Sequence, residues 1–189
     1  MTESIKFDPK KLAKLNDPER FKILNPDIIW NALNLQNPKT LVDIGAGTGF
    51  FATIFLEKLG NGKIYACDTS EVMIEWMQSN INNINLVPLK CSEEAVALPD
   101  GIADLVYMIN VHHELLEPQK MIKEAYRLLK PEGKIAIIDW KDEKMEQGPP
   151  LDIRISGSTI IKQLEDAGFK NISSHKLLLL HSFITGQKQ

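Results

Sequence analysis

The chain has 189 residues, 43% hydrophobic and 25% charged, and its 22 basic and 25 acidic residues leave a net charge of −3. This length suits one domain with a modest appendage, and the composition excludes a disordered, collagen-like or coiled-coil protein. Without a basic excess, a protein that binds nucleic-acid backbones is disfavoured.

The sequence also allows predictions about the cellular compartment of the protein. Two cysteines, Cys67 and Cys91, are too few for a disulfide framework. The N-terminus shows no basic segment followed by an apolar stretch, so no signal peptide is predicted. No apolar run approaches the roughly 18 residues that span a bilayer. We therefore expect a cytoplasmic protein with reduced thiols and no membrane partner.

The first 37 residues are predicted to form a helical lid or flank. Pro9, Pro18 and Pro26 each precede a short stretch with helical apolar spacing. Proline suits the first turn of a helix, where its missing N–H has no partner anyway. Two or three short helices should end at a turn over 37–39, and residues 38–189 form the main domain.

From residue 40 onward, strands and helices alternate. Apolar runs predict strands over 40–44, 63–67, 85–90, 104–110 and 134–140. Helical spacing predicts helices over 48–59, 70–81, 118–129 and 158–167. Two last strands, 171–180 and 182–186, have little between them and should form an antiparallel pair. In the second helix, the residues predicted to face the core are Val72, Met73, Trp76 and Met77.

This alternation predicts an α/β fold with a parallel sheet covered on both faces. The nearly continuous apolar strands agree, because strands buried on both faces do not alternate. In such a sheet the ligand lies outside the carboxyl ends of the strands. Residues that directly follow each strand are therefore the candidates for a functional site.

A glycine-rich turn follows the first strand, with glycines at positions 45, 47 and 49. The dinucleotide fingerprint needs its third glycine where Phe50 stands, which disfavours a nicotinamide (NAD)-dependent oxidoreductase. No Gly-Lys-Ser/Thr phosphate loop is present either. Glycines here permit a tight turn and close approach of the backbone to a ligand, and a purely structural turn is the alternative.

Asp68 ends the second strand, 23 residues beyond Gly45. A carboxylate at this place can accept hydrogen bonds from both hydroxyls of a ribose. The alternative is a helix N-cap, although Thr69 and Ser70 are able to cap the next helix equally well.

Four segments, in the right order, resemble the class I S-adenosylmethionine (SAM)-dependent methyltransferases. Val42–Gly49 resembles motif I of that family, and Asp68 matches its ribose-binding acid. Residues 98–106 resemble the entry to its fourth strand and 127–134 the turn before its fifth. The likeness covers 38–188 and is greatest to small-molecule enzymes related to the ubiquinone/menaquinone and arsenite methyltransferases. It implies a Rossmann-like three-layer sandwich with a seven-stranded, mostly parallel sheet, order 3-2-1-4-5-7-6, last strand antiparallel.

The resemblance implies SAM as cofactor and S-adenosylhomocysteine (SAH) as product. Gly45, Gly47 and Gly49 would wrap the methionine portion. Asp43 would orient that loop or bond the ligand's amino group through water, and Asp68 would hold the ribose. The other implied cofactor contacts are Ala46, Thr69, Met73, Ser92, Glu93 and Asn110. Of these, Thr69, Met73, Ser92 and Glu93 would lie at the adenine, and Asn110 beside the methionine carboxylate or the transferred methyl.

Elementary chemistry agrees with this implication. SAM has no phosphate, so a glycine turn without lysine suffices, and the acidic Asp43, Asp68 and Glu93 suit a sulfonium cation. Methyl transfer is an in-line displacement that needs the acceptor about 3–3.5 Å from the methyl group. Positioning therefore supplies much of the acceleration.

Residues after the fourth and fifth strands are candidates for the acceptor side. In His112-His113-Glu114, His113, or less readily His112, is a candidate general base for a hydroxyl or thiol. The alternative is a loop residue that caps the next turn and shapes the pocket. Asn110 and His113 are the candidate catalytic residues. Arg154 is either a partner for an acidic acceptor or a solvated charge.

Two absences narrow the acceptor. After the fourth strand the chain lacks the Asn-Pro-Pro-aromatic quartet of family members that methylate planar amines, and no large insertion interrupts the core. Cys67 and Cys91 are interpreted as structural rather than as metalloid ligands, and no metal is expected. The prediction is a methyltransferase (EC 2.1.1.-) for a small-molecule acceptor, with a homodimer as a possible assembly. A non-catalytic SAM-binding or oligomerising module is the alternative.

Overall fold

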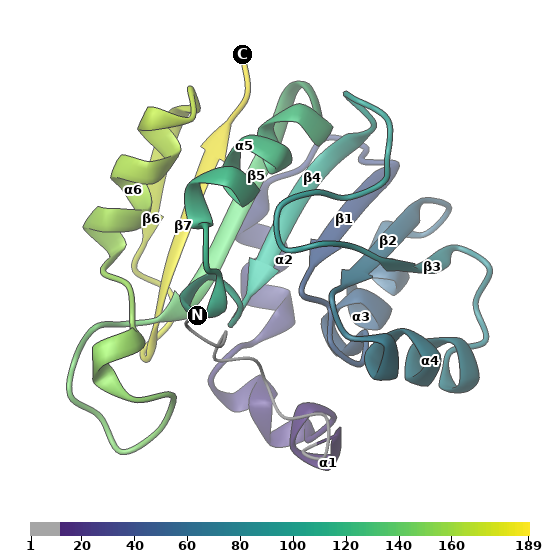
Figure 1. Ribbon diagram of the computed structural model, residues 1–189, viewed down its shortest axis with the longest axis horizontal. Helices are drawn as coiled ribbons and strands as arrows, with labels where there is room; N and C mark the ends of the chain where they lie inside the picture. The colour runs from purple at the N-terminus through teal and green to yellow at the C-terminus, as the bar shows by residue number, and fades with distance from the viewer. Residues whose placement is uncertain (1–11) are drawn as a thin grey trace.

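Seven strands form one twisted sheet with helices on both faces (Figure 1). The computed structural model describes residues 12–189, so Pro9 and the beginning of the predicted lid lie outside it. The strands are β1 (Thr40–Ile44), β2 (Lys63–Asp68), β3 (Leu86–Lys90), β4 (Ala103–Ile109), β5 (Leu129–Trp140), β6 (Lys170–His175) and β7 (His181–Gln187). The α-helices are α1 (Leu12–Leu15), α2 (Pro26–Leu33), α3 (Phe50–Leu59), α4 (Glu71–Asn80), α5 (Pro118–Leu128) and α6 (Gly157–Asp166). Three short 3-10 helices are η2 (Pro18–Lys22), η3 (His112–Glu114) and η4 (Leu151–Ile153).

The strand order is β3-β2-β1-β4-β5-β7-β6. Strands β1 to β5 pair in parallel, and β7 runs antiparallel to both β5 and β6. The predicted Rossmann-like sandwich and its strand order are therefore confirmed.

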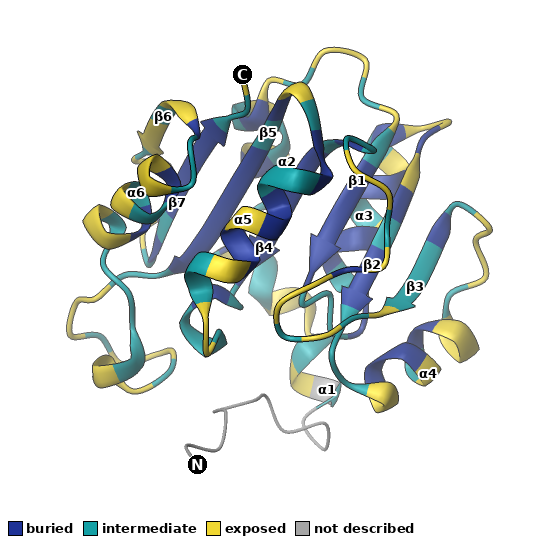
Figure 2. Cartoon of the chain, turned by 45° about the horizontal axis from the view of Figure 1, so that its top comes forward, coloured by how far each residue is buried: buried dark blue, intermediate teal, exposed yellow. Residues whose placement is uncertain are grey.

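Two buried layers hold the sheet between its helices. On one face, strand residues such as Leu41 and Tyr107 pack with α2, α3 and α4. On the other face, their neighbours Val42 and Val106 pack with α5 and α6. Alternate residues of one strand thus enter different layers, which explains why the central strands are buried along most of their length (Figure 2).

Two of the helices before β1 begin at prolines, as predicted. Pro18 opens η2 and Pro26 opens α2. The Asn25 side chain caps α2 by accepting hydrogen bonds from the N–H groups of Asp27 and Ile28, at 2.9 and 3.2 Å. These short helices depend on caps and packing because so few residues give little intrinsic helical stability.

Three local predictions were wrong. Val72 is 46% exposed, and Ile74 is buried instead, because the inward stripe of α4 follows Met73, Ile74 and Met77. Strand β6 ends at His175, so residues 176–180 form a connection rather than more strand. Strand β5 begins before the predicted turn, because Leu129 already pairs with Ala103 ahead of a shift in register.

Glu124 on α5 is a buried carboxylate that sequence periodicity does not single out; it is 9% exposed. Its Oε1 accepts hydrogen bonds from the Val96 N–H at 2.8 Å and from Nη2 of Arg127 at 2.7 Å. Its Oε2 accepts a hydrogen bond from Nε of Arg127, also at 2.7 Å. Glu124 therefore fastens the segment between β3 and β4 to α5.

We expect Glu124→Ala to lower the free energy of unfolding by about 2–3 kcal/mol, because the Val96 N–H and the Arg127 guanidinium would lose a charged partner. Urea denaturation measures this change. Glu75→Ala removes an exposed glutamate of α4 and should stay within about 0.5 kcal/mol of the wild type. Equal stabilities for the two variants would contradict the prediction.

Candidate active site

The carboxyl ends of β1, β2 and β4 meet at one edge of the sheet, on the side where α1 lies (Figure 2). The turn after β1 is fastened to the end of β2. The N–H groups of Gly45 and Ala46 both donate to the carbonyl oxygen of Cys67, at 2.8 and 2.9 Å. The predicted glycine turn and the predicted acidic residue after β2 are therefore neighbours in space.

All three glycines of this turn occupy conformations with positive φ that other residues rarely adopt. Gly45 has φ +72°, and a Cβ there would lie 2.4 Å from a methyl carbon of Val111. Gly47 has φ +57°, and a Cβ there would meet only Leu15, at 3.5 Å. The shape of the turn thus requires glycine, and it forms a cradle that side chains would fill.

Asp68 joins this turn to the start of α4. Its Oδ2 accepts a hydrogen bond from the Gly47 N–H and its Oδ1 accepts one from the Ser70 N–H, both at 2.8 Å. Burial raises the pKa of Asp68, while these hydrogen bonds oppose the rise. The N-cap of α4 is Ser70 rather than Asp68, so Asp68 supports the turn that leads into the helix instead of capping it. Each carboxylate oxygen keeps a second lone pair for a ligand.

Asp43 lies at the same edge and is 3% exposed. Burial raises the pKa of its carboxyl to about 8, with the charge of Asp68 adding to the rise. The Tyr107 hydroxyl and the charge of Arg20 oppose it. Asp43 and Tyr107 are register partners on β1 and β4, which places their side chains on the same face. A cation bound here would stabilise the ionised form of Asp43.

Arg20 is a site residue that sequence reasoning missed. Its guanidinium carbon lies 5.0 Å from the ring centroid of Phe50 and 5.1 Å from that of Phe51. Nη1 donates a hydrogen bond to the carbonyl oxygen of Leu15. The only signal in the sequence was a basic residue in a short helix, and nothing in its spacing indicates that η2 lies against α3 near Asp43.

The segment before β1 also reaches the glycine turn directly. The Thr48 hydroxyl donates to Oδ1 of Asn16 at 2.9 Å, and Leu15 is the side chain nearest to Gly47. The described part of the predicted lid, residues 12–37, therefore lies against the turn.

The residues predicted to lie at the adenine are only partly together. Met73 is buried at the start of α4 and Thr69 is half-buried beside Asp68. The end of β3 joins them, because the Cys91 N–H donates to the carbonyl oxygen of Asp68 at 3.0 Å. Ser92 is exposed, and its hydroxyl accepts the Ala95 N–H at 3.0 Å within its own turn. Glu93 is half-buried next to it.

Asn110 follows β4 in a left-handed conformation, with φ +59°. Its N–H donates to the carbonyl oxygen of Ile138 at 2.8 Å. Within residues 12–189, the buried Oδ1 of its side chain has no hydrogen-bond partner. A buried acceptor without a donor costs about 1–3 kcal/mol, so this atom is suited to a ligand.

His113 and Asp139 form a hydrogen-bonded pair. Nδ1 of His113 lies 2.7 Å from Oδ1 of Asp139, and the His113 N–H donates to Oδ2 at 2.9 Å. Burial lowers the pKa of His113, but the hydrogen bond and charge of Asp139, together with Glu114, raise it above its ordinary value. Because the carboxylate accepts from Nδ1, the neutral imidazole carries its proton there, which leaves Nε2 as the basic atom.

The neighbouring histidine differs. His112 is buried, and its Nε2 lies 2.8 Å from Oε1 of Gln163 on α6. Burial lowers the pKa of His112. Of the two histidines, only His113 has the carboxylate partner that orients a general base.

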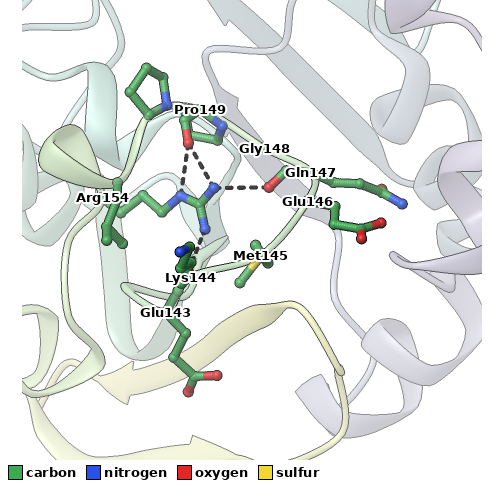
Figure 3. A pocket seen from close by; sticks show the side chains of 10 residues that line it. Glu143, Lys144, Met145, Glu146, Gln147, Gly148, Pro149 and Arg154 are labelled. Atoms are coloured by element: carbon green, nitrogen blue, oxygen red, sulfur yellow. Dashed lines mark hydrogen bonds between the residues drawn. The ribbon is translucent and has the colours of Figure 1, made fainter.

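Arg154 closes the loop between β5 and α6, residues 141–156, and is neither a solvated charge nor free for an acidic acceptor (Figure 3). Its Nε and Nη2 donate to the carbonyl oxygen of Pro149 at 2.9 and 2.7 Å. The other acceptors are the carbonyl oxygens of Gln147 at 2.8 Å, Glu143 at 2.8 Å and Lys141 at 3.3 Å. Around the guanidinium, the loop lines a cavity of about 360 Å³.

The same loop covers Trp140, the last residue of β5. A Cβ at Gly148 would come within 2.8 Å of the indole ring. The guanidinium carbon of Arg154 lies 5.9 Å from the ring centroid. The loop is therefore held against the end of β5, beside Asp139.

Three further observations concern residues 12–189. No three His, Cys, Asp or Glu side chains in this range gather closely enough to hold a metal ion. Cys67 is a buried free thiol whose pKa is raised by burial, which fits a structural role. None of the helices in the described range has the length and apolar character needed to cross a membrane.

Comparisons with known proteins agree on one family. A family model described as a methyltransferase domain matches residues 42–137. The ubiquinone/menaquinone biosynthesis C-methyltransferase UbiE of Escherichia fergusonii is 25% identical over 117 residues, which are 59% of this chain and 47% of that protein. The uncharacterized methyltransferase YdaC of Bacillus subtilis is 25% identical over 142 residues, 75% of this chain and 77% of that protein. The chain thus spans about half the length of the ubiquinone/menaquinone enzymes it matches.

Solved structures extend the likeness to the whole chain. A SAM-dependent methyltransferase from Aquifex aeolicus superposes with a TM-score of 0.91 and 33% identity, covering 97% of this chain and 100% of that one. Human N-acetylserotonin methyltransferase in complex with SAM has a TM-score of 0.76 and 18% identity, covering 95% of this chain and 55% of that one. The second likeness concerns the fold alone.

Proposed function

The chain belongs to the class I SAM-dependent methyltransferases, which convert SAM to SAH, and from this premise we propose that its methyl acceptor is a small molecule. The glycine turn, Asp43 and Asp68 hold the cofactor, and His113 serves as the general base. The observation that carries the proposal is the buried His113–Asp139 pair at the edge of the sheet that the glycine turn occupies.

The residues at the ends of β1 and β2 fit the cofactor. Asp68 has lone pairs left for the two ribose hydroxyls after accepting its two backbone N–H groups. Gly47 leaves room where a side chain would otherwise stand. In this proposal Thr69 and Met73 lie beside the adenine, with Ser92 and Glu93 at its edge.

The methionine portion of SAM carries an ammonium and a carboxylate group. Asp43 and Arg20 carry the opposite charges. We assign the ammonium group to Asp43, whose buried carboxylate favours a cation. We assign the carboxylate of SAM to Arg20, whose guanidinium lies near Asp43. Asn110, which follows β4, offers its unpartnered Oδ1 to this portion of SAM as a hydrogen-bond acceptor.

His113 supplies the proton chemistry. SAM supplies an electrophilic methyl group, and the acceptor hydroxyl or thiol must lose a proton as it is methylated. Nε2 of His113 takes this proton, and Asp139 stabilises the imidazolium through Nδ1. This pair favours catalysis over the alternative of a non-catalytic SAM-binding module.

The small-molecule assignment rests on the domain content of the described residues and on the net charge. The seven strands and their helices occupy residues 12–189 without an inserted domain, and the net charge of −3 gives no support for a nucleic-acid substrate. Cys67 is a buried free thiol, which supports a cytoplasmic location. The homodimer stays a prediction.

The proposal is tested by calorimetry with SAM and SAH, followed by labelled SAM with a panel of small phenols, thiols and amines. We expect both ligands to bind and at least one acceptor to be methylated. Binding without turnover on any acceptor would favour the non-catalytic module. No binding of either ligand would overturn the proposal.

We further propose that residues 12–37, the described part of the predicted lid, close over the cofactor, supported by the contacts of Asn16 and Leu15 with the glycine turn. Asn16→Ala should weaken SAM affinity about fivefold, because one hydrogen bond worth about 1 kcal/mol would no longer hold the segment to the turn. Calorimetry measures the change, and Asn31→Ala, an exposed residue of α2, serves as the control. Unchanged affinity in Asn16→Ala would indicate a flank rather than a lid.

A further inference from the structure

His181 is a buried histidine that the chemistry above does not use. The residue is 0% exposed, and neither ring nitrogen has a hydrogen-bond partner within residues 12–189. Each such group costs about 1–3 kcal/mol when it is buried unpaired. Phe183, two residues along β7, belongs to the apolar layer on that face, so a phenylalanine at 181 would avoid this cost. The imidazole indicates a partner that residues 12–189 do not provide.

The position of His181 links it to the active site. It opens β7 and pairs with Trp140, the last residue of β5, with ring centroids 4.3 Å apart. The preceding residue of β5, Asp139, holds His113, on the opposite face of the sheet because consecutive strand residues point to opposite faces. His181 also belongs to the wall of a cavity of about 570 Å³, which the connection between β6 and β7 lines as well.

The surrounding charges define what this ring is able to bind. Burial lowers the pKa of His181 to about 4, the charges of Arg20, Lys141 and Arg154 act in the same direction, and only Asp139 opposes them. The ring is therefore neutral near pH 7 and offers one N–H donor and one lone pair. The charge of Arg20 also lowers the pKa of Asp43. Arg20 therefore influences both a residue assigned to the cofactor and His181.

We propose that His181 binds the methyl acceptor, and that the acceptor presents a hydroxyl or carbonyl oxygen to it rather than an ammonium group. A hydroxyl donates and accepts, as the neutral imidazole does. The three cations Arg20, Lys141 and Arg154 disfavour a second positive charge beside the sulfonium. Trp140 packs against the His181 ring and is itself covered by the loop that Arg154 fastens. This inference rests on the proposed function.

The test compares two probes of similar size, 4-methylphenol and benzylamine, which is an ammonium ion at pH 7. The full chain, with ¹⁵N-labelled histidine, is saturated with SAH and titrated with each probe while the imidazole resonances are followed. We expect 4-methylphenol to shift the His181 resonances and benzylamine to leave them unchanged. His181→Phe should bind 4-methylphenol at least about tenfold more weakly, with SAH affinity within about twofold of the wild type.

His175→Phe is the matched control, because His175 belongs to the wall of the same cavity and packs on Phe183, with ring centroids 4.6 Å apart, but has Thr185 as its hydrogen-bond partner. This variant should bind 4-methylphenol as the wild type does. His181→Phe should melt at the same or a higher temperature, since it removes two unpaired polar atoms. Equal phenol binding by wild type and His181→Phe, preference for benzylamine, or no binding of either probe to the SAH complex would overturn the inference. Failure of SAH itself to bind would instead overturn the proposed function.

Discussion

Asp68→Ala is expected to weaken SAH binding about 100-fold or more. The substitution removes hydrogen bonds from two ribose hydroxyls to a charged acceptor, each worth about 1.5–3 kcal/mol, and each 1.4 kcal/mol corresponds to a tenfold change in affinity. It also releases the N–H groups of Gly47 and Ser70, which the carboxylate holds at 2.8 Å. The glycine turn would then lose part of its support.

Calorimetry with SAH measures this effect, and two further variants separate its causes. Asp68→Asn keeps the size and one acceptor oxygen, so we expect an affinity between those of the wild type and Asp68→Ala. Asp166→Ala removes an exposed carboxylate at the end of α6 and should leave the affinity unchanged. If Asp68→Ala bound SAH within about fivefold of the wild type, Asp68 would serve only the backbone contacts.

His113→Gln and Asp139→Asn are each expected to lower kcat by about 100-fold or more, the range that a positioned general base contributes. Glutamine has no basic nitrogen, and asparagine cannot stabilise an imidazolium by its charge. Neither residue is assigned to the cofactor, so SAH affinity should change by less than about threefold. Single-turnover assays with the acceptor found in the panel would measure the rates. Unchanged rates in both variants would favour the alternative that this loop only shapes the pocket.

The pH dependence gives a second readout for the same pair. His113 must be neutral to accept a proton, so kcat/KM should rise with pH through its pKa, which lies above the ordinary value of 6.5. Asp139→Asn removes the main raising influence and should move this rise to lower pH. Because the folded-state pKa is raised, the pair stabilises the fold fully below the unfolded pKa, and this stabilisation is lost as pH increases through the folded pKa.

The fold was predictable because its signals are local. Continuous apolar strands such as 104–110, helical spacing such as 118–129 and the glycine turn after β1 each follow from neighbouring residues. The errors arose where tertiary contacts decide. Val72 has a favourable spacing, but α4 is turned so that Ile74 takes the buried place, and the leucines after His175 leave the sheet.

The site was predictable only in part, for the same reason. Asp43, Asp68 and the glycines follow strands directly, where ligands of such sheets bind. Asp139 meets His113 across 26 residues, and Arg20 reaches the site from a 3-10 helix. His181 begins β7, and the pairing of this strand with β5 and β6 decides what surrounds the side chain. No spacing within the sequence reports these contacts.

The loop held by Arg154 has a consequence for how substrate preference changes among related chains. Its guanidinium binds carbonyl oxygens, which every residue carries whatever its side chain. Apart from Gly148, which lies against Trp140, the side chains from 143 to 149 are free to vary while the backbone keeps its path. We therefore expect substitutions in this one stretch to change acceptor preference with no redesign of the sheet or of the cofactor residues.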